Sequence, residues 1–272
     1  MGATGKSIAD IGHRLTEDCE SLSDWMACNK FKLNAGKTHL LVVGTSRRLG
    51  ALTEQLEVVM DGVTLKESEE KVETLLGIKI KCDLEWTVQV KVLVDKLKKR
   101  LGGLAYLRNI MSVSDKKNII EGIFNSVLCY CLPLFGGSSN SDLKALQMQQ
   151  NKAARIALCL PPRSNRSKMY DKLKWLTVLQ LVVYHTLLCV HRIRKEKEPE
   201  YLANIFCNEN VRGNSRILVD RIRIELQRNS FTHRGAIEWN KLPPDLRSEP
   251  KLSKFKTGLK VWVAENVERF LP

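Results

Sequence analysis

Residues 25–44 have the sequence WMACNKFKLNAGKTHLLVVG, and the fold that we expect for the start of the chain follows from them. They combine the end of a helix, a turn at residues 34–36 and an apolar run at residues 39–43. Asn and Gly tolerate positive φ angles, which suits a tight reversal. A short run of β-branched residues and leucine next to a turn is typical of a buried strand. The stretch therefore predicts a helix–turn–strand unit in which Lys37 directly follows the turn.

The segments on either side extend this unit. Upstream, apolar residues recur at helical spacing and predict an amphipathic helix that ends near Asn29; they are Ile8, Ile11, Leu15, Cys19, Leu22 and Trp25. Downstream, residues 58–65 predict a hairpin on an Asp-Gly turn, and residues 75–81 alternate apolar and basic side chains like a half-buried strand. We expect one helix with a few antiparallel strands here.

The remainder of the chain has the patterns of helices. The first begins near residue 85, with one apolar face and several basic residues on the other; the apolar residues are Trp86, Val90, Leu93, Leu97, Leu101 and Leu104. Similar periodicity predicts helices at residues 114–130, 142–160, 173–193 and 252–270. The expected fold class is therefore α+β, mostly α.

The positive charge is concentrated in the second half of the chain. The net charge is +14; residues 1–150 carry 20 Lys and Arg against 18 Asp and Glu, whereas residues 151–272 carry 24 against 12. Such asymmetry favours a polyanionic partner. We expect RNA and DNA, with no membrane partner and no small-molecule substrate. The alternative is a basic surface that only keeps the protein soluble.

The cysteines and the N-terminal sequence indicate the compartment. None of the eight cysteines forms a Cys-x₂-Cys pair, so zinc signatures are missing. Their scattered positions favour a reducing environment without a disulfide framework, and residues 1–10 lack the apolar core of a signal peptide. We expect an intracellular protein of the nucleus or cytoplasm that is not secreted.

Several motifs, in order, carry a family resemblance. The pattern W-x₃-N-x-F-x-L-N-x₂-K-T-x-L-L-V-x-G at residues 25–44 is followed by Leu-Gly-Ile at residues 76–78. Weaker matches follow at Tyr130 and at residues 150–153, and a Trp-Asn-x-Leu-Pro run begins at Trp239 within residues 231–256. Together they resemble the reverse transcriptase of a non-LTR (LINE-type, jockey-like) retrotransposon. The resemblance covers the C-terminal portion of that enzyme: the end of the palm, the thumb and a C-terminal segment.

This resemblance implies an architecture and a function. Residues 1–82 would be the truncated end of the palm, residues 83–160 a helical thumb, and residues 161–272 a basic helical C-terminal region. The chain would be a C-terminal fragment of an RNA-directed DNA polymerase that retains primer and template binding. Lys37 matches the lysine of the fourth palm motif, and Gly77 lies in the strand pair that grips the primer terminus.

The resemblance also bears on catalysis. Polymerisation uses two metal ions held by aspartates. The family places these aspartates upstream of residues 8–29, one of them in an Ala-Asp-Asp box. The sequence contains no Asp-Asp dipeptide. We therefore predict no catalytic residue, no metal ligand and no cofactor in this chain, whereas the intact family enzyme uses Mg²⁺. By itself the chain is expected to be inactive.

The candidate nucleic-acid contacts are basic residues of helices and loops, together with Lys37 and Gly77. Loop arginines after a helix are suited to phosphate contacts, and arginine matches phosphate bidentately; residues 212–234 contain six arginines and no lysine. The basic candidates are Lys98, Lys99, Arg100, Lys152, Arg155, Arg163, Arg166, Arg212, Arg216, Arg221 and Arg223.

Two other interpretations remain open at this stage. In the first interpretation, the chain is a non-enzymatic helical scaffold derived from a transposable element. This interpretation predicts association through apolar faces with little dependence on salt. In the second interpretation, the chain is a non-functional product that does not fold alone, because a palm sheet without its central strands leaves an open edge.

Overall fold

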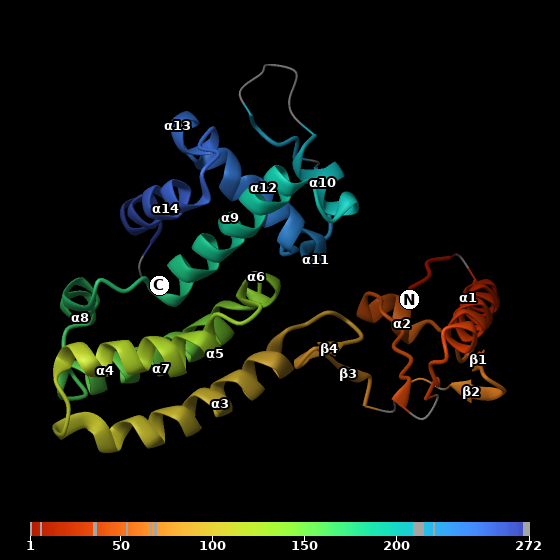
Figure 1. Cartoon of the computed structure of the whole chain (residues 1–272), viewed down its shortest axis with the longest axis horizontal. Helices are drawn as coiled ribbons and strands as arrows, with labels where there is room; N and C mark the ends of the chain where they lie inside the picture. Colours follow the sequence, from red (N-terminus) through yellow and green to blue (C-terminus); the bar gives the residue numbers. More distant parts are fainter. Residues whose placement is uncertain are drawn as a thin grey trace. The chain divides into compact units, whose positions relative to one another are not determined.

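The computed structural model describes residues 2–5, 7–34, 37–52, 54–65, 67, 70–208, 215–219 and 221–268 (Figure 1). The fold is α+β and mostly α, with 62% helix and 7% strand, as the periodicity predicted. The chain divides into two compact units, Met1–Val88 and Gln89–Pro272. The finer division into residues 1–82, 83–160 and 161–272 stays a prediction.

The first unit is one long helix packed on a hairpin. Helix α1 (Ile8–Cys28) contacts strand β1 (Val58–Met60), which pairs antiparallel with β2 (Val63–Leu65). The core beneath them consists of Cys19, Leu56, Val58, Met60 and Leu65. Both the helix and the hairpin were predicted, and the turn residues Asp61 and Gly62 have the positive φ angles that an Asp-Gly hairpin requires.

Two strand predictions in this unit are wrong. Residues 39–43 form no strand; Leu40 makes only an isolated bridge to Glu67. The run packs the apolar side chains of Leu40 and Val42 on the core, but it does not join either two-stranded sheet. Residues 75–81 are likewise not one strand. Leu76 and Gly77 have φ of 49° and 80°, so they form the turn between β3 (Val72–Leu75) and β4 (Ile78–Lys81). The short helix α2 (Ser46–Gly50) completes the unit.

The second unit is helical. Helix α3 (Thr87–Ala105) spans the boundary between the units, and the elements that follow are η2 (Tyr106–Asn109), α4 (Val113–Ile120), η3 (Glu121–Asn125), α5 (Ser126–Leu128), α6 (Leu132–Phe135), α7 (Asn140–Leu158), α8 (Arg166–Leu173), α9 (Val178–Glu196), α10 (Glu200–Phe206), α11 (Glu225–Arg228), α12 (Phe231–Lys241), α13 (Pro244–Arg247) and α14 (Leu252–Asn266). The predicted helices at residues 85 onward and 142–160 are confirmed as α3 and α7. The helix predicted at residues 252–270 is confirmed as α14, which ends at Asn266; residues 269 and 270 lie outside the described residues. The segment 114–130 is confirmed as α4, η3 and α5 in succession.

The predicted helix at residues 173–193 begins later, at Val178. Lys174 has a left-handed conformation that ends α8, and Thr177 then caps α9 in a reciprocal capping box with Gln180. Helix α9 is central to this unit: it packs against α6, α7, α10, α12 and α14 (Figure 1). Its inner face contributes to a core that includes Leu187, Val190, Phe206, Trp239 and Phe255.

Candidate nucleic-acid interface

In the first unit, Lys37 and Gly77 lie in two segments that contact each other. Lys37 is exposed and donates its backbone N–H to the Asn34 carbonyl at 3.0 Å; residues 35 and 36 of this predicted turn lie outside the described residues. Gly77 is exposed in the β3–β4 turn. His39 Nδ1 lies 3.5 Å from Glu73 Oε1 of β3, so the chain that follows Lys37 runs beside the hairpin that carries Gly77.

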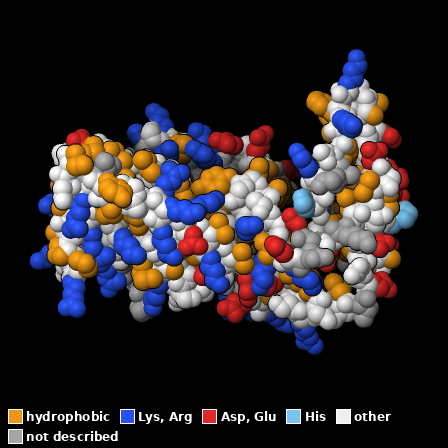
Figure 2. Space-filling model, turned by 90° about the horizontal axis from the view of Figure 1, so that it is seen from below, with side chains coloured by type: hydrophobic (Ala, Val, Ile, Leu, Met, Phe, Trp, Pro, Cys, Tyr) orange, Lys and Arg blue, Asp and Glu red, His pale blue; other side chains and the backbone are white. Residues whose placement is uncertain are grey.

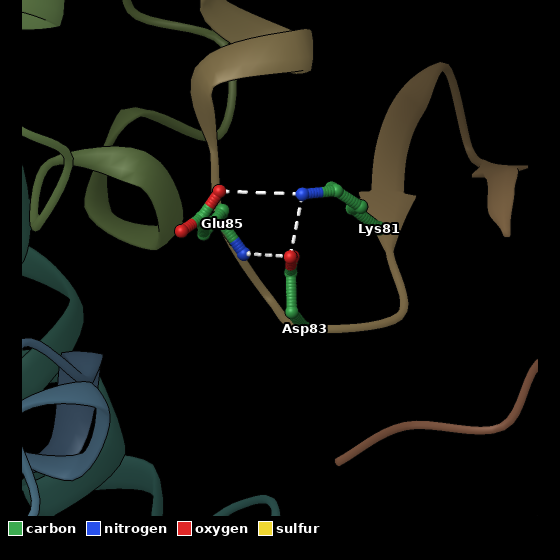
Figure 3. Close-up of polar contacts among 3 residues, drawn as sticks. All are labelled: Lys81, Asp83 and Glu85. Atoms are coloured by element: carbon green, nitrogen blue, oxygen red, sulfur yellow. Dashed lines mark hydrogen bonds and ion pairs between the residues drawn. The ribbon is translucent and has the colours of Figure 1, made fainter. Parts of the chain in front are cut away.

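At the end of that hairpin, in β4, one basic side chain is held by carboxylates. Lys81 Nζ lies 2.5 Å from Asp83 Oδ2 and 3.3 Å from Glu85 Oε2 (Figure 3). The Glu85 backbone N–H also donates to Asp83 Oδ1 at 3.0 Å. Burial raises the pKa of Asp83, but the hydrogen bonds from Lys81 and from the backbone outweigh it, and the net pKa is lowered. The Lys81 ammonium is therefore already paired, which makes it a poor phosphate ligand.

Helix α3 presents a basic face opposite its apolar one. Leu93, Leu97 and Leu101 are buried, so the helical period turns Lys98, Lys99 and Arg100 to solvent. Figure 2 shows Lys and Arg side chains (blue) spread over the helical part of the chain on this side of the molecule. Lys98 Nζ forms an exposed ion pair with Asp95 at 3.0 Å. Exposed pairs contribute only about 0–1 kcal/mol, so a phosphate group can displace this one readily.

A second group of candidates surrounds the end of α7. Lys152, Arg163 and Arg166 are exposed, whereas Arg155 is half-buried and its Nε has no hydrogen-bond partner. The positive charges of Arg155 and Arg166 both act to lower the pKa of the Tyr170 hydroxyl. Burial raises the Tyr170 pKa despite them.

The loop after α7 is held in place by groups that the sequence reasoning missed. Arg108 Nη2 donates to the Leu160 carbonyl at 2.9 Å, and the buried Lys116 donates from Nζ to the Arg108 carbonyl at 2.8 Å. Lys116 also lies 2.7 Å from Cys159 Sγ. Nothing in the local sequence distinguishes Arg108 or Lys116 from surface cations, because Leu160 lies 52 residues from Arg108 and Cys159 lies 43 residues from Lys116. These bonds fix the start of the loop that carries Arg163.

The third group lies between α10 and α11. Arg216, Arg221 and Arg223 are exposed, and Arg212 lies outside the described residues. The later Arg234 is structural instead: it donates to the Pro133 carbonyl at 2.7 Å and to the Asn229 carbonyl at 3.0 Å. Burial lowers the pKa of Arg234 to about 10.

A groove between α13 and α14 is mainly acidic, in contrast to the basic groups described above. It encloses about 460 Å³, and its charged lining residues are Asp245, Glu249, Glu265 and Lys254. Three carboxylates against one ammonium make it unsuitable for a polyanion. Among the described residues, no three His, Cys, Asp or Glu side chains converge as metal ligands do.

Within the described ranges, no single helix has the length and apolar composition to cross a membrane; α8 and α9, with 41° between them, satisfy both criteria only as a bent pair. Comparison with known proteins gives no match to any family model, curated protein or solved structure.

Proposed function

We propose that the chain is a nucleic-acid-binding part of an RNA-directed DNA polymerase of the non-LTR retrotransposon class. Residues 1–82 would correspond to the end of the palm, residues 83–160 to the thumb and residues 161–272 to a basic C-terminal region. Its role would be to hold primer and template through their phosphates. The collinear motifs at residues 25–44, 76–78 and 231–256 support the family, and the charge asymmetry supports the partner.

One observation carries the binding role. Nine candidate cations of the second unit are exposed on a folded helical scaffold; they are Lys98, Lys99, Arg100, Lys152, Arg163, Arg166, Arg216, Arg221 and Arg223. Cations that are fixed to helices and anchored loops contact phosphate at little cost in conformational entropy. Binding of this kind releases counterions and therefore weakens steeply as salt rises.

The chemistry assigned to this chain is binding alone. In the intact class, aspartates hold Mg²⁺ and the metal ions activate the 3′ oxygen. The chain has no Asp-Asp dipeptide, and so we assign it no catalytic step. Lys37 would be the one residue of the active-site region that it supplies.

The test measures the affinity of the chain for a labelled RNA–DNA hybrid across a salt series. Each neutralised phosphate changes the slope of log K against log salt by about −0.9 on duplex DNA. We expect a slope steeper than about −4, which corresponds to several phosphate contacts. The triple variant Lys98→Gln, Lys99→Gln, Arg100→Gln should make the slope shallower by about 2 to 3.

A second triple variant controls for net charge. Lys251→Gln, Lys256→Gln, Lys260→Gln removes the same charge from exposed positions at or near α14. It should change the slope much less than the α3 variant does. If both variants weaken binding equally, the α3 face is no specific interface. If the wild-type chain shows no salt-dependent binding, the proposal fails and a scaffold role through apolar contacts becomes the better explanation.

A further inference from the structure

Two aromatic side chains are exposed beside each other at the C-terminal end of α1. The rings of Trp25 and Phe31 are stacked, with their centroids 6.3 Å apart and 14° between their planes. Trp25 is 57% exposed and Phe31 is 61% exposed. Large aromatic side chains usually bury most of their surface in a core or an interface. An exposed pair of them therefore indicates a contact with another molecule.

A hydrogen-bonded turn fixes the two rings next to each other. After the last turn of α1, Lys30 has a left-handed conformation, with a φ of 59°. Its N–H donates to the Ala27 carbonyl at 3.1 Å. The Phe31 N–H donates to the Met26 carbonyl at 2.8 Å. These are the two bonds of a Schellman motif, which reverses the chain at the end of a helix, so the backbone itself brings Phe31 back towards Trp25.

The core of the first unit covers neither ring. Among the described residues, this core includes Leu22 and Leu33 but neither Trp25 nor Phe31. Trp25 continues the apolar spacing of α1, yet it lies beyond the end of the core. The chain is thus anchored before and after the pair, at Leu22 and Leu33, and the two rings remain outside.

The chain around the two rings is basic. Residues 25–53 contain five Lys and Arg and no Asp or Glu; the five are Lys30, Lys32, Lys37, Arg47 and Arg48. Lys30 and Lys32 adjoin Phe31 on either side, and both are exposed. The acids of α1 end with Asp24. A ligand that covers the rings therefore meets cations, which favours a flat apolar group that carries negative charge over a neutral protein surface.

We propose that Trp25 and Phe31 form a stacking site for an unpaired base of single-stranded RNA or DNA, and that Lys30 and Lys32 contact the phosphates next to this base. Aromatic rings combined with positive charge are the means by which proteins hold single strands without sequence preference. The inference rests on the nucleic-acid binding proposed above, and it adds a contact to the bases. A duplex keeps its bases paired, so only an unpaired segment fits this site.

The first experiment compares the affinity of the full chain for two labelled single strands of equal length and charge. One is an oligouridylate of about ten nucleotides, within the usual site sizes for single strands. The other is an abasic ribose-phosphate oligomer, which has no bases to stack. The wild type should bind the oligouridylate about tenfold more tightly, as expected for one stacked base. Equal affinity for the two strands would overturn the site.

Two single variants assign this preference to the ring pair. Trp25→Leu and Phe31→Leu each remove one ring at an exposed position, where substitutions have little effect on folding. Each should bind the oligouridylate about tenfold more weakly than the wild type does and the abasic strand equally well. Tyr106→Leu is the matched control, because it removes a ring that is 82% exposed in the second unit. Equal losses in all three variants would overturn the assignment to this pair.

The double variant Lys30→Gln, Lys32→Gln tests the phosphate contacts. On single strands, each neutralised phosphate contributes about −0.7 to the slope of log K against log salt. The variant should therefore make the slope shallower by about 1.4 for both strands and retain the preference for the strand with bases. An unchanged slope would contradict the assignment of the two lysines.

Binding to the RNA–DNA hybrid separates this inference from the proposed function. The bases of the hybrid are paired, so Trp25→Leu and Phe31→Leu should bind it as the wild type does. If the wild type binds the hybrid with a steep salt dependence and both ring variants bind the oligouridylate normally, the proposed function stands and the stacking site is overturned. If the wild type binds neither the hybrid nor the oligouridylate, both proposals fail.

Discussion

The Tyr170 hydroxyl lies 2.9 Å from Asn151 Oδ1, and this contact joins α8 to α7 inside the second unit. The same hydroxyl is 3.0 Å from Gln150 Oε1, and Gln150 Nε2 donates to the Leu176 carbonyl at 2.9 Å. Gln150 and Asn151 are therefore structural, and within residues 150–153 only Lys152 faces solvent. The two kinds of role alternate along one short stretch of α7.

Removal of this hydroxyl should destabilise the second unit. Tyr170→Phe keeps the ring and removes the hydroxyl, but Gln147 Nε2 still donates to Gln150 Oε1 at 3.2 Å and to Asn151 Oδ1 at 3.0 Å. The expected cost is therefore that of a lost hydrogen bond, about 0.5–1.5 kcal/mol of unfolding free energy. Urea unfolding measures this loss. Tyr201→Phe is the control, since Tyr201 is 69% exposed. Equal stability of the two variants would show that the network contributes nothing.

The helices could be predicted from sequence because their signal is local. The buried residues of α3 repeat at positions 90, 93, 97, 101 and 104, and the same period places residues 98–100 outside. The strand prediction at residues 39–43 was wrong because a strand requires a pairing partner, and the sequence of the run does not show whether it has one.

The turn before α7 should be intolerant of any side chain at Gly137. A Cβ there would lie 2.2 Å from the Asn229 carbonyl oxygen, which is backbone and cannot rotate away. Gly137→Ala should cost about 1–3 kcal/mol or more. By contrast, Gly103→Ala in α3 meets no atom within 4 Å and should stabilise by about 0.5–1 kcal/mol. Chemical denaturation of both variants checks the opposite signs; a neutral Gly137→Ala would contradict this packing.

Two positions on α14 test the core around Trp239. Leu259 is 0% exposed and belongs to that core, whereas Val261, two residues on, is 54% exposed. Leu259→Ala should reduce the unfolding free energy by about 2–5 kcal/mol. Val261→Ala should stay within about 0.5 kcal/mol of the wild type. Similar losses at the two sites would mean that α14 does not dock through this face.

The thiol of Cys129, which follows α5, should make stability fall in alkali. Burial raises its pKa from 9.0 to about 12. A thiol whose folded pKa is raised favours folding fully below pH 9 and loses this contribution as the pH rises towards 12, because the unfolded chain ionises first. The unfolding free energy should therefore decrease above pH 9 by up to about 1.4 kcal/mol per pH unit.

Urea unfolding at a series of pH values from neutral to alkaline measures this slope in the wild type and in two variants. Cys129→Ala should show a shallower decrease, whatever its stability at neutral pH, because it has no thiol to ionise at this position. Cys28→Ala removes a thiol that is exposed in the folded chain and should keep the wild-type slope. If all three proteins lose stability in parallel, Cys129 ionises equally well in the folded and unfolded chain, and its burial has no energetic consequence.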